Sequence, residues 1–144
     1  MAIAIEGVTA LLAVWDVPTS LQFYRDVLGF EVVSHSPPFT EAKDDFGWAL
    51  LRLNGVELML NNAYEDNVRP AQGEDPARVK AHGDTTLYFG CRDVDGAYAA
   101  LRERGVVVEA PKVAYYGMKQ LYLKDPDGYG VCFQWSAETA VAGE

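Results

Sequence analysis

The chain has 144 residues, of which 49% are hydrophobic and 23% are charged, so it is long enough to bury the core of one domain. Twenty-one acidic and 12 basic residues give a formal net charge of −9, which repels nucleic-acid phosphates and anionic lipid surfaces. Because no apolar run approaches a membrane span and no N-terminal segment has the pattern of a cleavable signal, we expect a soluble cytoplasmic protein with no nucleic-acid or membrane partner. Two cysteines are too few for a disulfide framework, so both are expected as reduced thiols.

The first half of the chain predicts one strand, one helix and three further strands. The apolar stretch 8–14 indicates a strand that is buried on both faces or nearly so. Pro18 suits the first turn of a helix that Thr19 or Ser20 can cap and that Gly29 ends. The remaining strands are expected at residues 31–35, 48–53 and 56–60, and the last two flank Asn54-Gly55, a pair typical of a tight hairpin turn.

A polar connection follows and then the pattern recurs. Residues 61–83 form a long polar stretch with Pro70, Gly73 and Pro76 and read as a linker between two modules. The second module is expected to have a strand at 85–91, a helix capped by Asp93 or Asp95 and ended by Gly105, a strand at 106–108, and a closing hairpin around residues 125–128. Residues 136–144 are Ala-rich and polar, which predicts a flexible tail.

The two halves form an internal repeat. Asp93 lies 77 residues after Asp16, and Gly128 lies 73 residues after Gly55, so corresponding landmarks recur with a small deletion. A four-stranded sheet with one helix leaves one face uncovered, which a partner sheet must bury. We therefore expect an α+β fold in which paired βαβββ modules form a curved sheet around a cleft, with module 1 at about 5–62, a linker at about 63–82 and module 2 at about 83–135 within a single domain.

Two motifs carry a resemblance to a known family. The run Phe23-Tyr24-Arg25-Asp26-Val27-Leu28-Gly29-Phe30, together with Asp125-Pro126-Asp127-Gly128 before the final strand, resembles the vicinal oxygen chelate superfamily of glyoxalases, bleomycin resistance proteins and dioxygenases. The resemblance covers nearly the whole chain and implies paired βαβββ modules and, commonly, a homodimer. It leaves function open, because this fold is used both by metalloenzymes and by binding proteins without a metal.

The resemblance also implies where a metal would be held. Metal-using members carry His or Gln early in the first strand of each module and Glu in the last strand, and these positions correspond here to Thr9, Thr86, Met59 and Cys132. Two hydroxyls, a thioether and one thiol are a poor donor set for a catalytic divalent ion. We therefore expect no metal and no cofactor. A site made of His82, Asp84 and Glu57 is an alternative, although the neighbouring Gly83 favours a loop position for His82.

Strand alternation then identifies the side chains that should face the cleft. The face that contains the four positions above should also contain Leu11, Ala13, Leu50, Asn61 and Gln120. The loop before the penultimate strand exposes aromatic residues that suit either a ligand entrance or a dimer contact. The candidate ligand-binding residues are Trp48, Arg52, Glu57, Met59, Thr86, Tyr88, Tyr115, Tyr116, Met118, Tyr122, Cys132 and Gln134.

The function that these residues favour is metal-independent binding of a small organic molecule, of the bleomycin-resistance type that confers antibiotic resistance by sequestration. The net charge suits a cationic ligand, and aromatic rings attract cations, although a solvated acidic surface is the simpler explanation of that charge. The alternative is a glyoxalase- or dioxygenase-type lyase, isomerase or oxygenase with a non-standard metal site and Glu57 as general base. Arg52 and Glu57 lie on adjacent hairpin strands, so they can also simply pair with each other.

Overall fold

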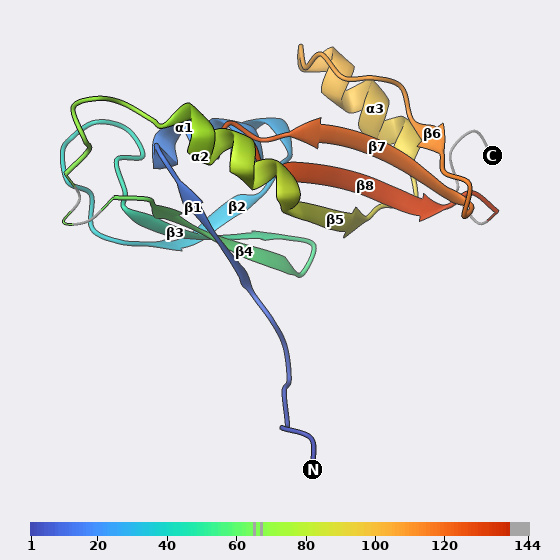
Figure 1. Cartoon of the computed structure of the whole chain (residues 1–144), viewed down its shortest axis with the longest axis horizontal. Helices are drawn as coiled ribbons and strands as arrows, with labels where there is room; N and C mark the ends of the chain where they lie inside the picture. The colour runs from blue at the N-terminus through green and yellow to red at the C-terminus, as the bar shows by residue number, and fades with distance from the viewer. Residues whose placement is uncertain (65, 67, 139–144) are drawn as a thin grey trace. The chain divides into compact units, whose positions relative to one another are not determined.

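Each half of the chain forms one four-stranded sheet with a helix on one face (Figure 1). The computed structural model describes residues 1–64, 66 and 68–138, and the chain divides into a first unit, Met1–Gly73, and a second unit from Glu74 onward. The α+β fold class expected from the sequence is confirmed. Most of the predicted tail, residues 139–144, lies outside the described residues.

In the first unit the strand order is β1-β4-β3-β2, with β1 parallel to β4 and the other neighbours antiparallel. Asn54 and Gly55 both have positive φ, 49° and 82°, as a two-residue hairpin turn between β3 and β4 requires. The elements are β1 (Ala10–Val14), α1 (Val17–Leu21), a π-helical continuation (Gln22–Val27), β2 (Glu31–His35), β3 (Trp48–Leu53) and β4 (Val56–Asn62).

Two sequence predictions for this unit need correction. The first strand begins at Ala10 and is not buried on both faces, because α1 covers one face only and Leu11 on the other face is half exposed. The helix is capped by Asp16, whose carboxylate accepts a hydrogen bond from the Thr19 N–H at 3.1 Å, and not by Thr19 or Ser20. Gly29, with φ of 100°, ends the helix as predicted.

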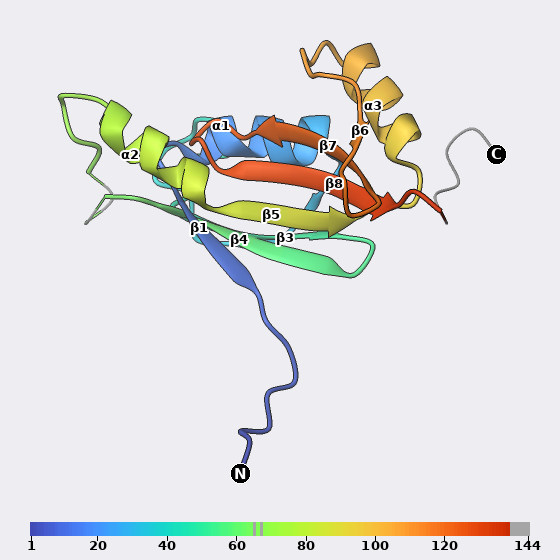
Figure 2. The ribbon, with the colours of Figure 1, turned by 45° about the vertical axis from the view of Figure 1, so that its right-hand side comes forward.

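In the second unit the strand order is β5-β8-β7-β6, again with the first pair parallel. The helix α3 packs against β7 and β8 and is seen beside their ends in the two ribbon views (Figures 1 and 2). The elements are α2 (Pro76–Ala81), a 3₁₀ turn (His82–Asp84), β5 (Thr86–Gly90), α3 (Val94–Glu103), β6 (Lys112–Val113), β7 (Met118–Lys124) and β8 (Gly130–Ser136).

The sequence reading missed two features of this unit. Residues 106–108 are not a strand, and Val107 is fully exposed, because the edge pairing with β7 is made further along by Lys112 and Val113. The expected linker contains the short helix α2. Asp93 caps α3, one of the two caps considered, and accepts a hydrogen bond from the Gly96 N–H at 2.9 Å.

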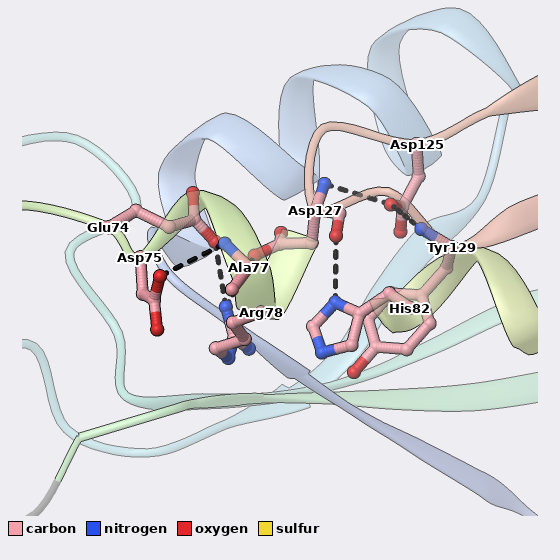
Figure 3. Close-up of polar contacts among 8 residues, drawn as sticks. All are labelled: Glu74, Asp75, Ala77, Arg78, His82, Asp125, Asp127 and Tyr129. Carbon is pink, nitrogen blue, oxygen red and sulfur yellow. Dashed lines mark hydrogen bonds and ion pairs between the residues drawn. The ribbon is translucent and has the colours of Figure 1, made fainter. Parts of the chain in front are cut away.

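The helix α2 is attached to the turn between β7 and β8 (Figure 3). Arg78 of α2 pairs with Glu74 at 2.7 Å and lies 3.4 Å from a carboxylate oxygen of Asp127. His82 donates from Nδ1 to the Asp127 carbonyl at 2.7 Å, and its ring stacks on Tyr129 at a centroid distance of 4.0 Å. Contacts distant in sequence therefore hold a helix in which no residue is fully buried.

The core of each unit lies between its helix and the covered face of its sheet. In the first unit Leu12, Val14, Leu58 and Leu60 alternate with the uncovered residues and are almost completely buried. In the second unit the core beneath the helix includes Val94, Leu101, Leu121 and Val131. Among the described residues, no helix has the length and apolar character needed to cross a membrane.

Candidate functional site

The face of the first sheet that α1 leaves uncovered is a mixed apolar and polar surface. Cross-strand pairing places Leu11, Met59 and Leu50 in one row and Ala13, Asn61 and Trp48 in the next. These are the side chains that strand alternation predicted for one face. The structure therefore brings the predicted first-unit residues together on one surface.

Arg52 and Glu57 lie at the hairpin end of the same face. Both Nε and Nη2 of Arg52 donate to the Oε2 atom of Glu57, at 3.1 and 2.7 Å. The two side chains are directly opposite each other on β3 and β4 and remain half exposed. Of the roles considered for this pair, mutual pairing is the one that the contacts support.

The uncovered face of the second sheet is more polar. One row across β5, β8 and β7 consists of Tyr88, Cys132 and Tyr122, and the next consists of Gly90, Gln134 and Gln120. Thr86, Met118 and Lys124 lie on the same face by strand alternation. The predicted second-unit residues on these strands thus also share one surface.

Tyr88 and Tyr122 form a pair over the middle of this face. Their phenol oxygens are 3.0 Å apart and their rings meet edge to face, while each side chain remains about half exposed. The hydrogen bond with Tyr88 raises the pKa of Tyr122 well above that of an ordinary tyrosine. Cys132 lies between the two strands, is completely buried, and has its pKa raised by that burial. The pair is therefore a hydrogen-bonding group above an inaccessible thiol.

A second polar group centres on Gln120, which is 8% exposed. Its Nε2 atom donates to the Tyr116 hydroxyl at 2.8 Å and to Oε1 of Gln134 at 2.9 Å. Tyr116 comes from the turn between β6 and β7, where Gly117 has φ of 87° and the Gly117 N–H donates to the Ala114 carbonyl. Tyr115 in this turn is fully exposed. The turn thus attaches one of its two tyrosines to the sheet and projects the other into solvent.

Two concave sites adjoin these faces. In the second unit a pocket of about 180 Å³ is lined by Gln120 and Tyr122 together with Glu109, Ala110, Lys112 and Ala114. In the first unit a pocket of about 390 Å³ is lined by Trp48, Asn61, Gly47 and residues 36–39. The sequence reading included Trp48 but missed the loop residues Pro37, Pro38 and Phe39, for which the only signal was a Pro-Pro pair after a strand.

The positions that would hold a metal in metal-using relatives do not fit one here. Thr9 precedes β1 and is exposed, Thr86 opens β5, Met59 is a thioether, and the Cys132 thiol is buried. Of these four donors only a thiolate would bind a divalent ion strongly. Over residues 1–64, 66 and 68–138, no group of three or more His, Cys, Asp or Glu side chains is placed to hold a metal ion.

The alternative metal set also lacks the expected geometry. His82 and Asp84 lie in a 3₁₀ turn and not on a strand, so they do not alternate onto the face that contains Thr86. His82 uses Nδ1 for the Asp127 carbonyl, and Glu57 is bonded to Arg52. The other histidine, His35, stacks on Phe46 at 3.8 Å at the end of β2. Both cysteines are free thiols.

Comparisons with known proteins agree with this fold. TnmS3, an antibiotic binding protein from Streptomyces sp. CB03234, is 24% identical over 94% of this chain and 99% of its own, with a TM-score of 0.66. A superfamily member from Sphaerobacter thermophilus is 25% identical, over 92% and 98% of the two chains, with a TM-score of 0.62. A bleomycin resistance determinant encoded on transposon Tn5 is 19% identical, over 92% and 98%, with a TM-score of 0.66. No curated protein matched the sequence.

The solved structures show a similar fold, and a family model assigns the chain to a superfamily. This family model describes the Glyoxalase/Bleomycin resistance protein/Dioxygenase superfamily and matches residues 7–133, which extend from before β1 into β8. The repeat, the two sheets and this match all concern the same stretch of chain. The chain therefore belongs to the Glyoxalase/Bleomycin resistance protein/Dioxygenase superfamily.

Proposed function

We propose that this protein binds and sequesters a small organic molecule of the antibiotic type, without a metal ion and without a covalent step. The observation that carries the proposal is the chemistry of the positions Thr9, Met59, Thr86 and Cys132, which offer no set of strong ligands for a divalent ion. The similarity to two solved structures, an antibiotic binding protein and a bleomycin resistance determinant, supports it.

The uncovered faces have the composition that such binding needs. Small-molecule sites are concave and mostly apolar, with a few placed polar groups that orient the ligand. Trp48 and Met59 supply the apolar surface in the first unit, and Tyr88, Tyr122 and Gln134 supply rings and hydrogen-bonding groups in the second. We propose that each of the two faces can contact a ligand through these side chains, and that Tyr115 and Tyr116 from the exposed turn contribute to the second face.

The enzymatic alternative requires Glu57 to act as a general base. Its Oε2 atom accepts two hydrogen bonds from Arg52 on an open surface, where a half-exposed ion pair is easily formed. A base also has to reach a proton on a bound substrate. The ion pair supports a structural role, so we place Glu57 on the binding surface and not in a reaction.

A thermal-shift experiment with metal-free bleomycin tests the proposal. Protein purified without chelators is analysed for bound metal, and its melting temperature is measured with and without bleomycin, before and after dialysis against EDTA. Ligand at 100 times its Kd stabilises a protein by about 2.7 kcal/mol, which for a chain of this size is a rise of about 5 to 10 °C. We expect the rise to survive EDTA. A tightly held stoichiometric divalent ion, whose removal abolishes binding, would overturn the proposal.

We further propose that the protein works in the cytoplasm as a homodimer. The resemblance to the family supports the dimer, and two free thiols suit a reducing compartment. Light scattering coupled to size exclusion measures the mass in solution. A mass of one 15.8 kDa chain over the working concentration range would refute the dimer.

A further inference from the structure

The uncovered face of the second sheet carries more hydrogen-bond donors than its own contacts use. Gln120 uses both Nε2 hydrogens, one for Tyr116 and one for Gln134. Tyr116 accepts in that contact, so its own O–H hydrogen remains, and Gln134 accepts through Oε1, so both of its Nε2 hydrogens remain. Within the described part of this unit, the one amide oxygen of the group without a hydrogen-bond donor is Oε1 of Gln120.

This surplus does not depend on how the two amides are oriented. If oxygen and nitrogen are exchanged in both glutamines, Tyr116 donates to Gln120 and Gln134 donates to it as well. The two Nε2 hydrogens of Gln120 and the second Nε2 hydrogen of Gln134 then remain, together with lone pairs on the amide and phenol oxygens. In either arrangement the group keeps N–H or O–H hydrogens that a ligand can use.

The tyrosine pair adds a further donor of the same kind. The Tyr88 and Tyr122 oxygens share one hydrogen at 3.0 Å, and Tyr122 also interacts with the Cys132 thiol, so the hydrogen left for a ligand is that of Tyr88 when Tyr122 donates to it. Both side chains are about half exposed, and the raised pKa of Tyr122 keeps the phenol protonated. The pair therefore presents an O–H group between two aromatic rings.

The charges around this face do not favour a cation. The four strands β5, β6, β7 and β8 contain no Asp or Glu. The charged residues that share the face are Lys124, opposite Gly130, and Lys112, opposite Gln120. Glu109 at the edge of the pocket is paired with Lys112 at 3.5 Å and is almost completely exposed. No carboxylate thus lies on these four strands, and of those beside them Glu109 is paired with Lys112 and Asp95 with Lys119.

We propose that the part of the ligand bound on this face is planar, uncharged and rich in acceptor oxygens, such as ring carbonyls and ethers, and is not a cation. This inference rests on the proposed binding function and deepens it by assigning a ligand class. Carbonyl and ether oxygens receive the unused O–H and N–H groups, and a flat ring system packs against the tyrosine rings. A cation here would meet donors and lysines.

Two flat probes that differ in charge test this assignment. Riboflavin has a neutral ring system with carbonyl acceptors, and proflavine is a planar cation; both are fluorescent, so binding is followed by quenching and anisotropy. We expect riboflavin to bind more tightly than proflavine. Raising the salt concentration should leave riboflavin binding unchanged, because a neutral ligand has no charge to screen.

The double variant Tyr88→Phe/Tyr122→Phe removes the phenol donor while keeping both rings. We expect it to weaken riboflavin binding about tenfold and to leave proflavine binding unchanged, because one hydrogen bond contributes on the order of a tenfold change in affinity. The control is Tyr98→Phe, which removes a phenol on α3 and should bind both probes like the parent protein. Melting curves verify that both variants fold.

The outcomes separate this inference from the function on which it rests. If proflavine binds more tightly, if riboflavin does not bind, or if the double variant binds riboflavin like the parent, the ligand class is wrong. The sequestration proposal still stands in those cases as long as bleomycin raises the melting temperature after EDTA treatment. Loss of that EDTA-resistant rise refutes the binding function itself, whichever of the two planar probes binds.

Discussion

Gly128 in the β7–β8 turn offers a sharp test of how the second unit is assembled. Its φ is 89°, and a Cβ added there would lie 2.3 Å from the Val79 carbonyl oxygen and 2.9 Å from Val79 Cγ1. Val79 belongs to α2, the helix that the sequence reading missed. Gly105 has a similar φ of 82° but no atom within 4 Å of the same position. The two glycines therefore share the backbone conformation and differ in the contact.

The magnitudes follow from that difference. Alanine in a left-handed conformation costs about 1 to 2 kcal/mol, and this applies to both Gly105→Ala and Gly128→Ala. Overpacking against a neighbour adds about 1 to 3 kcal/mol, and only Gly128→Ala incurs it, because its neighbour is a backbone oxygen that cannot rotate away. We expect a total loss of about 2 to 5 kcal/mol for Gly128→Ala, from the roughly 5 to 15 kcal/mol of a typical domain.

Urea unfolding followed by circular dichroism measures both losses under one set of conditions. Hydrogen exchange of residues 76–84 supplies a local readout, because α2 can relieve the overlap by detaching while the sheet stays folded. We expect Gly128→Ala to lose more global stability than Gly105→Ala, or to lose exchange protection in that segment alone. Equal losses in the two variants, with unchanged protection of residues 76–84, would show that α2 does not pack on the turn.

Two further substitutions test ion pairs in the first unit. Asp44→Asn keeps a residue that tolerates the φ of 62° but removes the carboxylate that accepts from Arg25 at 2.8 and 3.0 Å. The hydrogen bond from Arg25 lowers the pKa of Asp44 in the folded protein. The stability that the ionised Asp44 carboxylate contributes is therefore present above pH 3.8, its unfolded pKa, and is lost as the pH falls through the lower folded pKa. We expect denaturant titration to show a loss of about 1 to 2 kcal/mol at neutral pH that shrinks in acid; a loss independent of pH contradicts this. Glu57→Gln should cost less than about 1 kcal/mol in the same assay, because its pair with Arg52 is half exposed.

The strands were largely predictable because alternation and turn chemistry are local signals. The predicted bounds of β2 and β3 match the structure, and Asn54-Gly55 forms the expected turn. The helix α2 was not predictable in the same way, because it has six residues, none of them fully buried, and it depends on Asp127 far along the chain. The strand predicted at residues 106–108 was wrong because local propensity was given too much weight. A Val-rich run has strand propensity, but this one has no partner strand.

The candidate faces were predictable and their internal contacts were not. Two-residue periodicity alone placed Tyr88, Cys132 and Gln134 on one surface, and the register agrees. No periodicity indicates that Gln120 bonds to Tyr116, because that contact depends on the shape of the turn before β7. The same holds for the pocket beside Trp48, which a loop closes.

Net charge was the sequence signal least informative about the ligand. Several acidic side chains of the second unit stabilise the fold: Asp75 and Asp93 cap helices by accepting from the N–H groups of Ala77 and Gly96, each at 2.9 Å. Asp125, 5% exposed, accepts from two backbone N–H groups in the β7–β8 turn. Backbone N–H groups at helix ends and turns hold these carboxylates. Their charges are part of the net charge of −9, but the carboxylates do not lie on the strands that carry Tyr88 and Tyr122. A ligand on those strands therefore meets neutral donors together with Lys112 and Lys124, and its chemistry has to be inferred from that face and not from the sum over the chain.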